Sequence, residues 1–172
     1  MFQVGDIIQY GIVGACRVAD IVTGIPCCGG RRMYVIKPLY CEGTIYAPVD
    51  SGKVFMRPIV SRQEAERIIG EIPAMEPRTY HEAQTVSQLV EYYEGCIRTH
   101  ECTDLVALTM FIYAKKKAAE QAKRKFGSVD EKYMRRAEDL LYGELAAALG
   151  IARDEVPRYI ERKVGALPVT IA

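Results

Sequence analysis

The sequence predicts an α+β protein, in which a small antiparallel β-barrel is followed by an all-α helical bundle. Up to about residue 60, short stretches rich in Val, Ile and Tyr alternate with glycines and prolines. Beyond that point, apolar residues recur at the i+3 and i+4 spacing of helices. The chain of 172 residues is 49% hydrophobic and 26% charged, which is the usual composition of a soluble folded protein.

Four segments of the first part have the length and the β-favouring composition of strands. They are DIIQYG (6–11), GACRVADIV (14–22), RRMYVIKPLY (31–40) and GTIYAPVD (43–50). Glycines fall between them, where tight turns require a positive φ. Because so short a sheet is marginally stable alone, we expect it to close or to pack on another part of the chain.

Capping boxes predict the first two helices, since a hydroxyl caps the helix amides and a glutamate three residues later reaches back. Ser61 starts a short helix that ends near Gly70. After a linker with two prolines, Thr79 starts a second helix. One face of that helix carries Val86, Leu89, Val90 and Tyr93.

Three further helices follow at helical spacing of their apolar residues. They run from about Asp104 to Lys125, from Ser128 to Gly150 and from Glu155 to Lys163. Gly127 stops the first of them, and Ser128 with Glu131 forms another capping box. Pro157 lies in the first turn of the last helix, where proline is tolerated.

The charge and the apolar pattern exclude several classes of protein. Lys and Arg number 23 and Asp and Glu 22, so the net charge is +1, whereas a protein that coats nucleic acid is far more basic. No apolar run is long enough for a membrane span, and the first residues lack the pattern of a secretion signal. We therefore expect a cytoplasmic protein with no membrane partner.

The cysteines and histidines do not form the pattern of a metal or catalytic site. The six cysteines have no Cys-x-x-Cys spacing, and His81 and His100 are the only histidines, so the ligand set of a structural zinc is incomplete. Neither histidine accompanies a nucleophile motif, and no phosphate-binding glycine loop precedes a helix. We expect no enzyme, metal, cofactor or small-molecule substrate. A thiol nucleophile at Cys96 is the remaining enzymatic alternative.

Basic residues gather on both sides of Gly127. Between residues 115 and 136, nine basic residues stand against three acidic ones, a local balance of +6. The candidates for phosphate contact are Lys123, Arg124, Lys125, Lys132, Arg135 and Arg136. The alternative is a solvated helix face, because lysines at a helix C-terminus also suit the macrodipole. The preceding stretch, 79–104, has a balance of −4 and should repel DNA.

A strand edge in the β half is a candidate protein-binding surface. Arg31 and Arg32 follow a glycine turn, and Tyr46 precedes Pro48 in a predicted strand. An exposed edge beside arginine and tyrosine suits pairing with another protein's sheet. The alternative is that the two arginines protect the edge from aggregation.

The segments FQVGDIIQYGIVGACRVADI, YVIKPLY and TIYAPVDSGKVFMRPIVS resemble the RNA-polymerase-interacting domain of the CarD/CdnL transcription regulators. A similar module occurs in the bacterial transcription-repair coupling factor. The helical segments LVEYYEGCIRTHECTDLVALTMFIYAKKK and RRAEDLLYGELAAAL are similar to that family's C-terminal helices. The resemblance extends over about residues 1–150 and is stronger in the first part.

The resemblance implies a Tudor-like β domain that docks on the β subunit of bacterial RNA polymerase by extending a sheet. It also implies a helical domain that reaches promoter DNA at the upstream edge of the melted bubble and stabilises the open complex. By position, Arg32 and Tyr46 match polymerase-contacting residues of the family, and Lys132 matches a basic residue that meets the DNA backbone. The predicted polymerase-binding residues are Arg31, Arg32, Tyr46 and Pro48.

Two positions depart from the family pattern. The family often wedges a tryptophan into the minor groove, but this chain has no tryptophan. A count without gaps places Val86 there, and an aliphatic wedge is possible; Tyr80 is the nearest aromatic residue in a shifted register. The usual polymerase-contacting arginine is replaced by Tyr46, which cannot make the same charged contact.

We therefore divide the chain into a Tudor-like polymerase-interacting β domain (1–62), a short helix and linker (63–78), and a helical, candidate DNA-contacting domain (79–172). The predicted function is that of a transcription regulator that binds polymerase, modulates promoter open-complex stability and is associated with the nucleoid. The alternative is an adaptor that docks on polymerase without DNA contact and presents its acidic helix to another protein.

Overall fold

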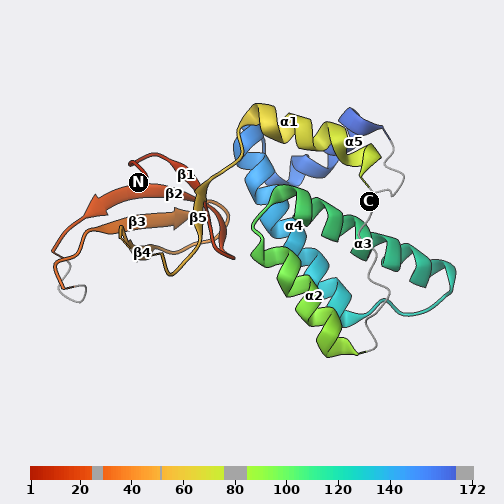
Figure 1. The fold of residues 1–172 in the computed structure, drawn as a ribbon. Coiled ribbons are helices and arrows are strands. Elements are labelled where there is room, and N and C mark those ends of the chain that lie inside the picture. Colours follow the sequence, from red (N-terminus) through yellow and green to blue (C-terminus); the bar gives the residue numbers. More distant parts are fainter. Residues whose placement is uncertain (25–28, 51, 76–84, 166–172) are drawn as a thin grey trace.

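The structure, a computed structural model, describes residues 1–24, 29–50, 52–75 and 85–165. Within these residues a five-stranded antiparallel sheet precedes five α-helices, so the predicted α+β class is confirmed (Figure 1). The strands are β1 (Ile7–Tyr10), β2 (Gly14–Val22), β3 (Met33–Pro38), β4 (Ile45–Pro48) and β5 (Met56–Pro58). The helices are α1 (Arg62–Glu71), α2 (Val86–Arg98), α3 (Cys102–Gln121), α4 (Ser128–Leu149) and α5 (Val156–Val164). Two short 3-10 helices are η2 (Ile72–Ala74) and η3 (Arg153–Glu155).

The strand order of the sheet is β4-β3-β2-β1-β5. Among the described residues β4 and β5 each pair with a single strand, so they form the two edges. One face of the sheet buries the apolar side chains that alternate along the strands. These are Ile8, Tyr10, Cys16, Val18, Tyr34, Ile36 and Ala47.

The opposite face of the sheet is divided between the helices and solvent. Gln9 of β1 and Ala15 of β2 are buried where the sheet meets α4. Farther along the same face, Arg17, Lys37 and Tyr46 are exposed. The β half thus packs on the helices at one end and leaves β4 free at the other (Figure 1).

The helical half is built around α4, which contacts each of the other four helices. Apolar residues at helical spacing along α4 lie in the core, where Ala137, Leu141 and Leu145 are buried. Gly150, with a left-handed φ of 66°, ends this helix as a glycine C-cap does. No helix in the described part of the chain combines the length and apolar character that a bilayer crossing requires.

Two predicted helix starts near the domain junction and the C-terminus are confirmed. The Ser61 hydroxyl accepts a hydrogen bond from the Glu64 amide at 3.1 Å, and α1 follows. The Glu64 carboxylate binds Arg67 and not the Ser61 amide, so only one half of the predicted capping box forms. Pro157 lies in the first turn of α5, as expected.

The predicted capping box at Ser128 is wrong. Gly127 is the N-cap of α4, Ser128 is its first helical residue, and no side chain caps the helix. A Cβ at residue 127 would lie 2.7 Å from the Asp130 carboxylate, so the backbone of a glycine makes room for that side chain. Glu131 instead forms an ion pair with Arg135 one turn later.

The helix that was expected to reach Lys125 ends at Gln121. Lys123 adopts a left-handed φ of 52°. The Arg124 amide bonds to the Ala119 carbonyl at 2.8 Å, and the Lys123 amide bonds to the Glu120 carbonyl at 3.0 Å. These two bonds are those of a Schellman motif, which ends a helix regardless of helix-favouring residues beyond it.

The predicted start of the second helix, at Thr79, lies outside the described residues. The described helix α2 begins at Val86, with a capping box formed by Thr85 and Gln88. Leu89 and Val90 are half-buried and Tyr93 is fully buried, as the predicted apolar face requires. Val86, which was expected on that face, is 64% exposed.

Replacing Lys123 with glycine should stabilise the fold, because a residue with a Cβ is strained by about 1 kcal/mol in the left-handed region. We expect Lys123→Gly to raise the free energy of unfolding in urea by roughly this amount. Lys132→Gly is the matched control: it places the same change inside α4 and should lower that free energy by about 1 kcal/mol. Equal effects of the two substitutions would contradict the assignment of a Schellman motif.

Candidate functional site

The first candidate surface is the free edge of the sheet at β4. Tyr46 pairs with Val35 and is 54% exposed. Pro48 pairs with Met33, and the Val49 amide donates to the Arg32 carbonyl at 3.0 Å. Three of the four predicted polymerase-binding residues therefore lie along the β3–β4 ladder, and Arg31 immediately precedes it.

The register shows which backbone groups this edge offers. Because Arg32 and Val49 form a hydrogen-bonded pair, the alternation of an antiparallel ladder directs the polar backbone groups of Tyr46 and Pro48 away from β3. Tyr46 then offers both an N–H and a carbonyl, whereas Pro48 offers a carbonyl only. An incoming strand would find its central pair of hydrogen bonds at Tyr46.

The second candidate surface is the turn between α3 and α4. Lys123, Arg124 and Lys125 are exposed, and none has an ion pair among the described residues. Arg124 and Lys125 border a surface hollow of about 360 Å³. Its other walls come from α3 and the start of α4, and are Lys115, Ala118, Ala119, Ala122, Phe126, Gly127 and Asp130.

The structure separates the predicted cations into paired and unpaired groups. Arg136 lies 2.6 Å from Glu94 of α2, and Arg135 lies 2.6 Å from Glu131. Lys132 is exposed, and its ammonium lies over the Tyr133 ring. Of the six basic candidates for DNA contact, only Lys123, Arg124, Lys125 and Lys132 are without an ion pair among the described residues. The sequence did not indicate the Arg136 pair, because its partner lies on another helix.

A buried polar cluster, which the sequence did not predict, holds this turn in place. Tyr93 of α2 donates to the Asp130 carboxylate, and the Lys115 ammonium lies 2.6 Å from the same oxygen. Burial and then the bond to Asp130 raise the pKa of Tyr93 well above its ordinary range. The cluster joins α2, α3 and α4 next to the basic turn, so the two helix ends that flank the turn are held together.

Val86 lies at the same end of the bundle as the basic turn. Tyr93 of α2 contacts both Asp130 and Tyr133 near the start of α4, so α2 and α4 begin at the same end of the bundle (Figure 1). Val86 precedes Tyr93 by seven residues, which is about 10 Å along a helix. The structure therefore presents an exposed aliphatic side chain and unpaired cations at one end. Tyr80, the alternative wedge, lies outside the described residues.

Comparison with protein families identifies the first part of the chain. Residues 2–60 match the family model described as the CarD-like/TRCF RID domain. The β half is a CarD-like/TRCF RID domain. A RID domain is a protein-interaction domain and has no catalytic role, and its presence supports an interaction with RNA polymerase in general. A comparison with curated proteins gave no match.

Three of the described cysteines, Cys16, Cys96 and Cys102, are buried, whereas Cys41 is exposed. Cys96 is buried between helices, and burial together with Glu144 raises the pKa of Cys102. Burial also raises the pKa of Cys16, in the RID domain, to about 11. The thiols with a raised pKa, Cys16 and Cys102, stay protonated and unreactive near neutral pH. Within the described ranges no three His, Cys, Asp or Glu residues gather as metal ligands; Cys27, Cys28 and His81 lie outside those ranges.

The RID domain meets the helical bundle at His100, a residue with a left-handed φ of 56°. Its ring stacks on Phe55 of the RID domain at a centroid distance of 4.4 Å. Burial, and then the positive charge of Arg57, lower the pKa of His100, while Gly11 and Glu101 act in the opposite direction. The junction therefore favours the neutral form of the His100 imidazole.

We expect the protein to lose stability as the pH falls through the ordinary histidine pKa of about 6.5. The unfolded state takes up the proton first, because the pKa of His100 is lower in the folded state, so acid favours unfolding. His100→Asn is the matched control, since asparagine tolerates a left-handed φ and does not titrate. Urea unfolding between about pH 8 and pH 5 should show a smaller loss for this variant, and identical pH profiles would refute the assignment.

Proposed function

We propose that the protein is a transcription regulator that binds the β subunit of bacterial RNA polymerase through its RID domain and modulates promoter open-complex stability through its helical domain. The observation that carries this proposal is the set of unpaired cations at one end of the bundle, in a chain whose other end is a RID domain. A cationic end favours the phosphate backbone. A protein with this activity would act in the cytoplasm, on the nucleoid.

The proposed mechanism is a shift of an existing equilibrium. A regulator that binds the open complex more tightly than the closed complex shifts the equilibrium toward the open complex. At saturation, the equilibrium constant between the two complexes changes by the ratio of the two affinities. The polymerase contact supplies a high local concentration, so that even a weak contact with DNA becomes effective. We therefore expect the free protein, with its net charge of +1, to bind DNA only weakly.

The proposed polymerase contact is the addition of a polymerase strand to the edge of β4. The exposed Tyr46, with its outward backbone groups, is at the centre of this edge. Arg31 and Arg32 lie beside it and would meet acidic or polar groups of the partner. Main-chain bonds explain how the contact tolerates a tyrosine at this position.

The proposed DNA contact uses Lys123, Arg124, Lys125 and Lys132, with Val86 as an apolar contact in the adjacent groove. Arg135 and Arg136 are assigned a lesser part, because each would have to give up a carboxylate partner. The ion pair of Arg136 also neutralises Glu94, which reduces the net negative charge of α2 next to the basic end. The remaining exposed acid of this helix, Glu91, is available to a protein partner if the adaptor alternative holds.

Tyr46→Pro should weaken polymerase binding if the contact is made by the main chain. The substitution removes one outward N–H, and it breaks no bond within the sheet because that N–H points away from β3. Tyr46→Ala is the control, since it removes the ring and keeps the N–H. In a pull-down or interferometry assay with the β subunit, we expect a loss of about tenfold or more for proline and a smaller loss for alanine. The reverse order would show that the tyrosine side chain makes the contact.

Charge reversal at the basic turn should shorten the lifetime of promoter open complexes. We expect Lys123→Glu with Lys125→Glu to remove most of the added lifetime, because both residues are unpaired and exposed. Arg158→Glu with Arg162→Glu on α5 is the matched control, with the same change in net charge. The lifetime is measured by competitor challenge at several salt concentrations. An unchanged lifetime with polymerase binding intact would favour the adaptor alternative.

A further inference from the structure

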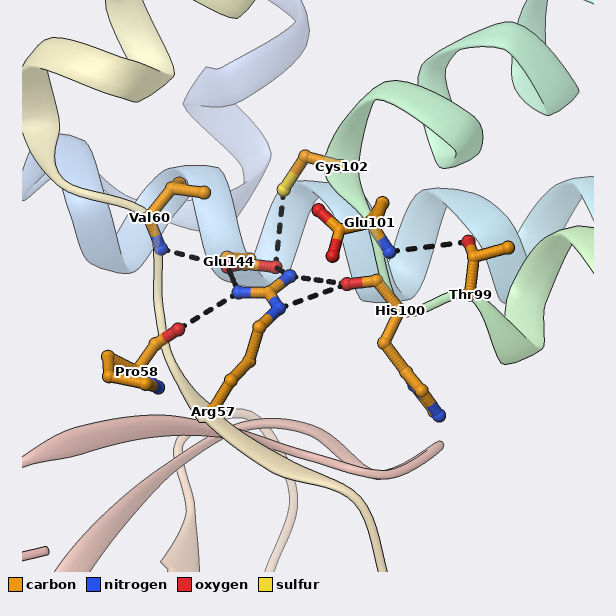
Figure 2. A network of polar contacts seen from close by, with 8 residues as sticks. All are labelled: Arg57, Pro58, Val60, Thr99, His100, Glu101, Cys102 and Glu144. Carbon is orange, nitrogen blue, oxygen red and sulfur yellow. Dashed lines mark hydrogen bonds and ion pairs between the residues drawn. The ribbon is translucent and has the colours of Figure 1, made fainter.

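A buried ion pair joins the RID domain to the helical bundle. Glu144 of α4 has a side chain with 0% exposure, and Arg57 of β5 binds both of its carboxylate oxygens (Figure 2). The Arg57 side chain is itself only 17% exposed. Burial disfavours the charged guanidinium, but the hydrogen bond and charge of Glu144 outweigh it and raise the pKa of Arg57.

Further donors complete the coordination of both groups. The Val60 amide donates to Glu144 at 2.9 Å, and the Cys102 thiol donates to its other oxygen at 3.2 Å. Arg57 also donates from Nε to the His100 carbonyl at 3.1 Å and from Nη1 to the Pro58 carbonyl at 3.0 Å. The network thus connects β5, the chain segment after it, the α2–α3 turn and α4 (Figure 2).

Part of the remaining junction, beyond the Phe55–His100 stack, is less closely filled. A surface hollow of about 260 Å³ lies between the β1–β2 turn and α4. Ile12, Val13 and Tyr40 line its RID side, and Leu140 and Asp139 line its helical side. Apolar packing alone would allow the two halves to rock across this hollow, because apolar contacts have little directionality.

We propose that Arg57 and Glu144 are positioning residues that fix the angle between the RID domain and the helical bundle. The planar guanidinium group donates two parallel hydrogen bonds to a carboxylate in one orientation. A lysine or an apolar pair would allow several orientations. A buried ion pair adds little stability over an apolar pair of similar size, so specification of the angle is the property that distinguishes it.

The consequence for activity rests on the proposed function. The β4 edge and the basic turn lie far apart on opposite sides of the junction (Figure 1). A fixed angle presents the basic turn to DNA each time that the RID domain is docked. A variable angle lowers the effective concentration of the basic turn at DNA, and the stabilisation of the open complex falls with it.

The test replaces both partners by apolar residues, as Arg57→Met with Glu144→Leu in the full chain. This double variant leaves no unpaired buried charge and should fold. Residual dipolar couplings of backbone amides then report the orientation of each half. We expect the couplings of both halves of the natural protein to fit one alignment tensor, and those of the double variant to require two. A single tensor for the double variant would overturn the proposal.

A second ion pair inside the helical bundle provides the control. Lys115→Met with Asp130→Asn removes a partly buried charge pair but keeps an acceptor for the Tyr93 hydroxyl. This variant should still fit one tensor, because both partners lie in the same half. Two tensors for the control would mean that loss of any buried ion pair loosens the junction, which would also overturn the proposal.

Promoter assays separate this proposal from the proposed function. We expect the Arg57→Met, Glu144→Leu variant to bind polymerase as the natural protein does and to stabilise open complexes about tenfold less or worse. If the variant requires two tensors but the natural protein itself does not prolong open complexes, the positioning role stands and the proposed function fails. If the variant keeps one tensor, the positioning role fails whatever the promoter assay shows.

Discussion

The contact between Arg57 and Glu144 is the interaction on which the relation of the two halves depends. A carboxylate with no exposed surface has to be matched by a cation and by hydrogen-bond donors, and here all of them come from outside its own helix. Arg57 can bind Glu144 only while β5 lies against the helical half. The left-handed His100 turns its carbonyl to the same guanidinium, so a strained backbone residue and an ion pair support one arrangement.

The same design recurs at the basic end of the bundle. Asp130 is buried beside Lys115 and Tyr93, which come from two other helices, and the cluster lies behind the turn that carries the unpaired cations. In both places a carboxylate of α4 collects donors from distant parts of the chain. Because α4 contacts the other four helices as well as β2, it transmits position from the RID domain to the basic turn. With its two buried carboxylates, α4 thus connects the RID domain to the helices that carry the basic turn.

Most elements of the fold followed from local patterns in the sequence, but the end of α3 and the capping of α4 did not. Strand segments and helical periodicity involve neighbouring residues, so β2 was predicted with its observed bounds, Gly14–Val22. The end of α3 depends on the left-handed conformation of Lys123. The sequence does not indicate this conformation, because lysine rarely adopts it. The ion pairs were beyond prediction for a different reason. Arg57 and Glu144 lie 87 residues apart, and no periodicity connects them.

Ion pairing determines which cations around the basic turn remain available for contact with phosphates. With a net charge of +1, the whole molecule exerts little long-range attraction on DNA. The ion pairs of Lys115, Arg135 and Arg136 remove three of the nine cations that the sequence placed around Gly127. Of the six that remain, Lys116 and Lys117 are half-buried, with their ammonium groups over the Tyr113 ring. The four unpaired candidates would contact about four phosphates, which corresponds to a salt slope of about −3.6. Under the proposed function, so small a contact would not hold DNA alone, and it would gain its effect from a docked RID domain at a fixed angle.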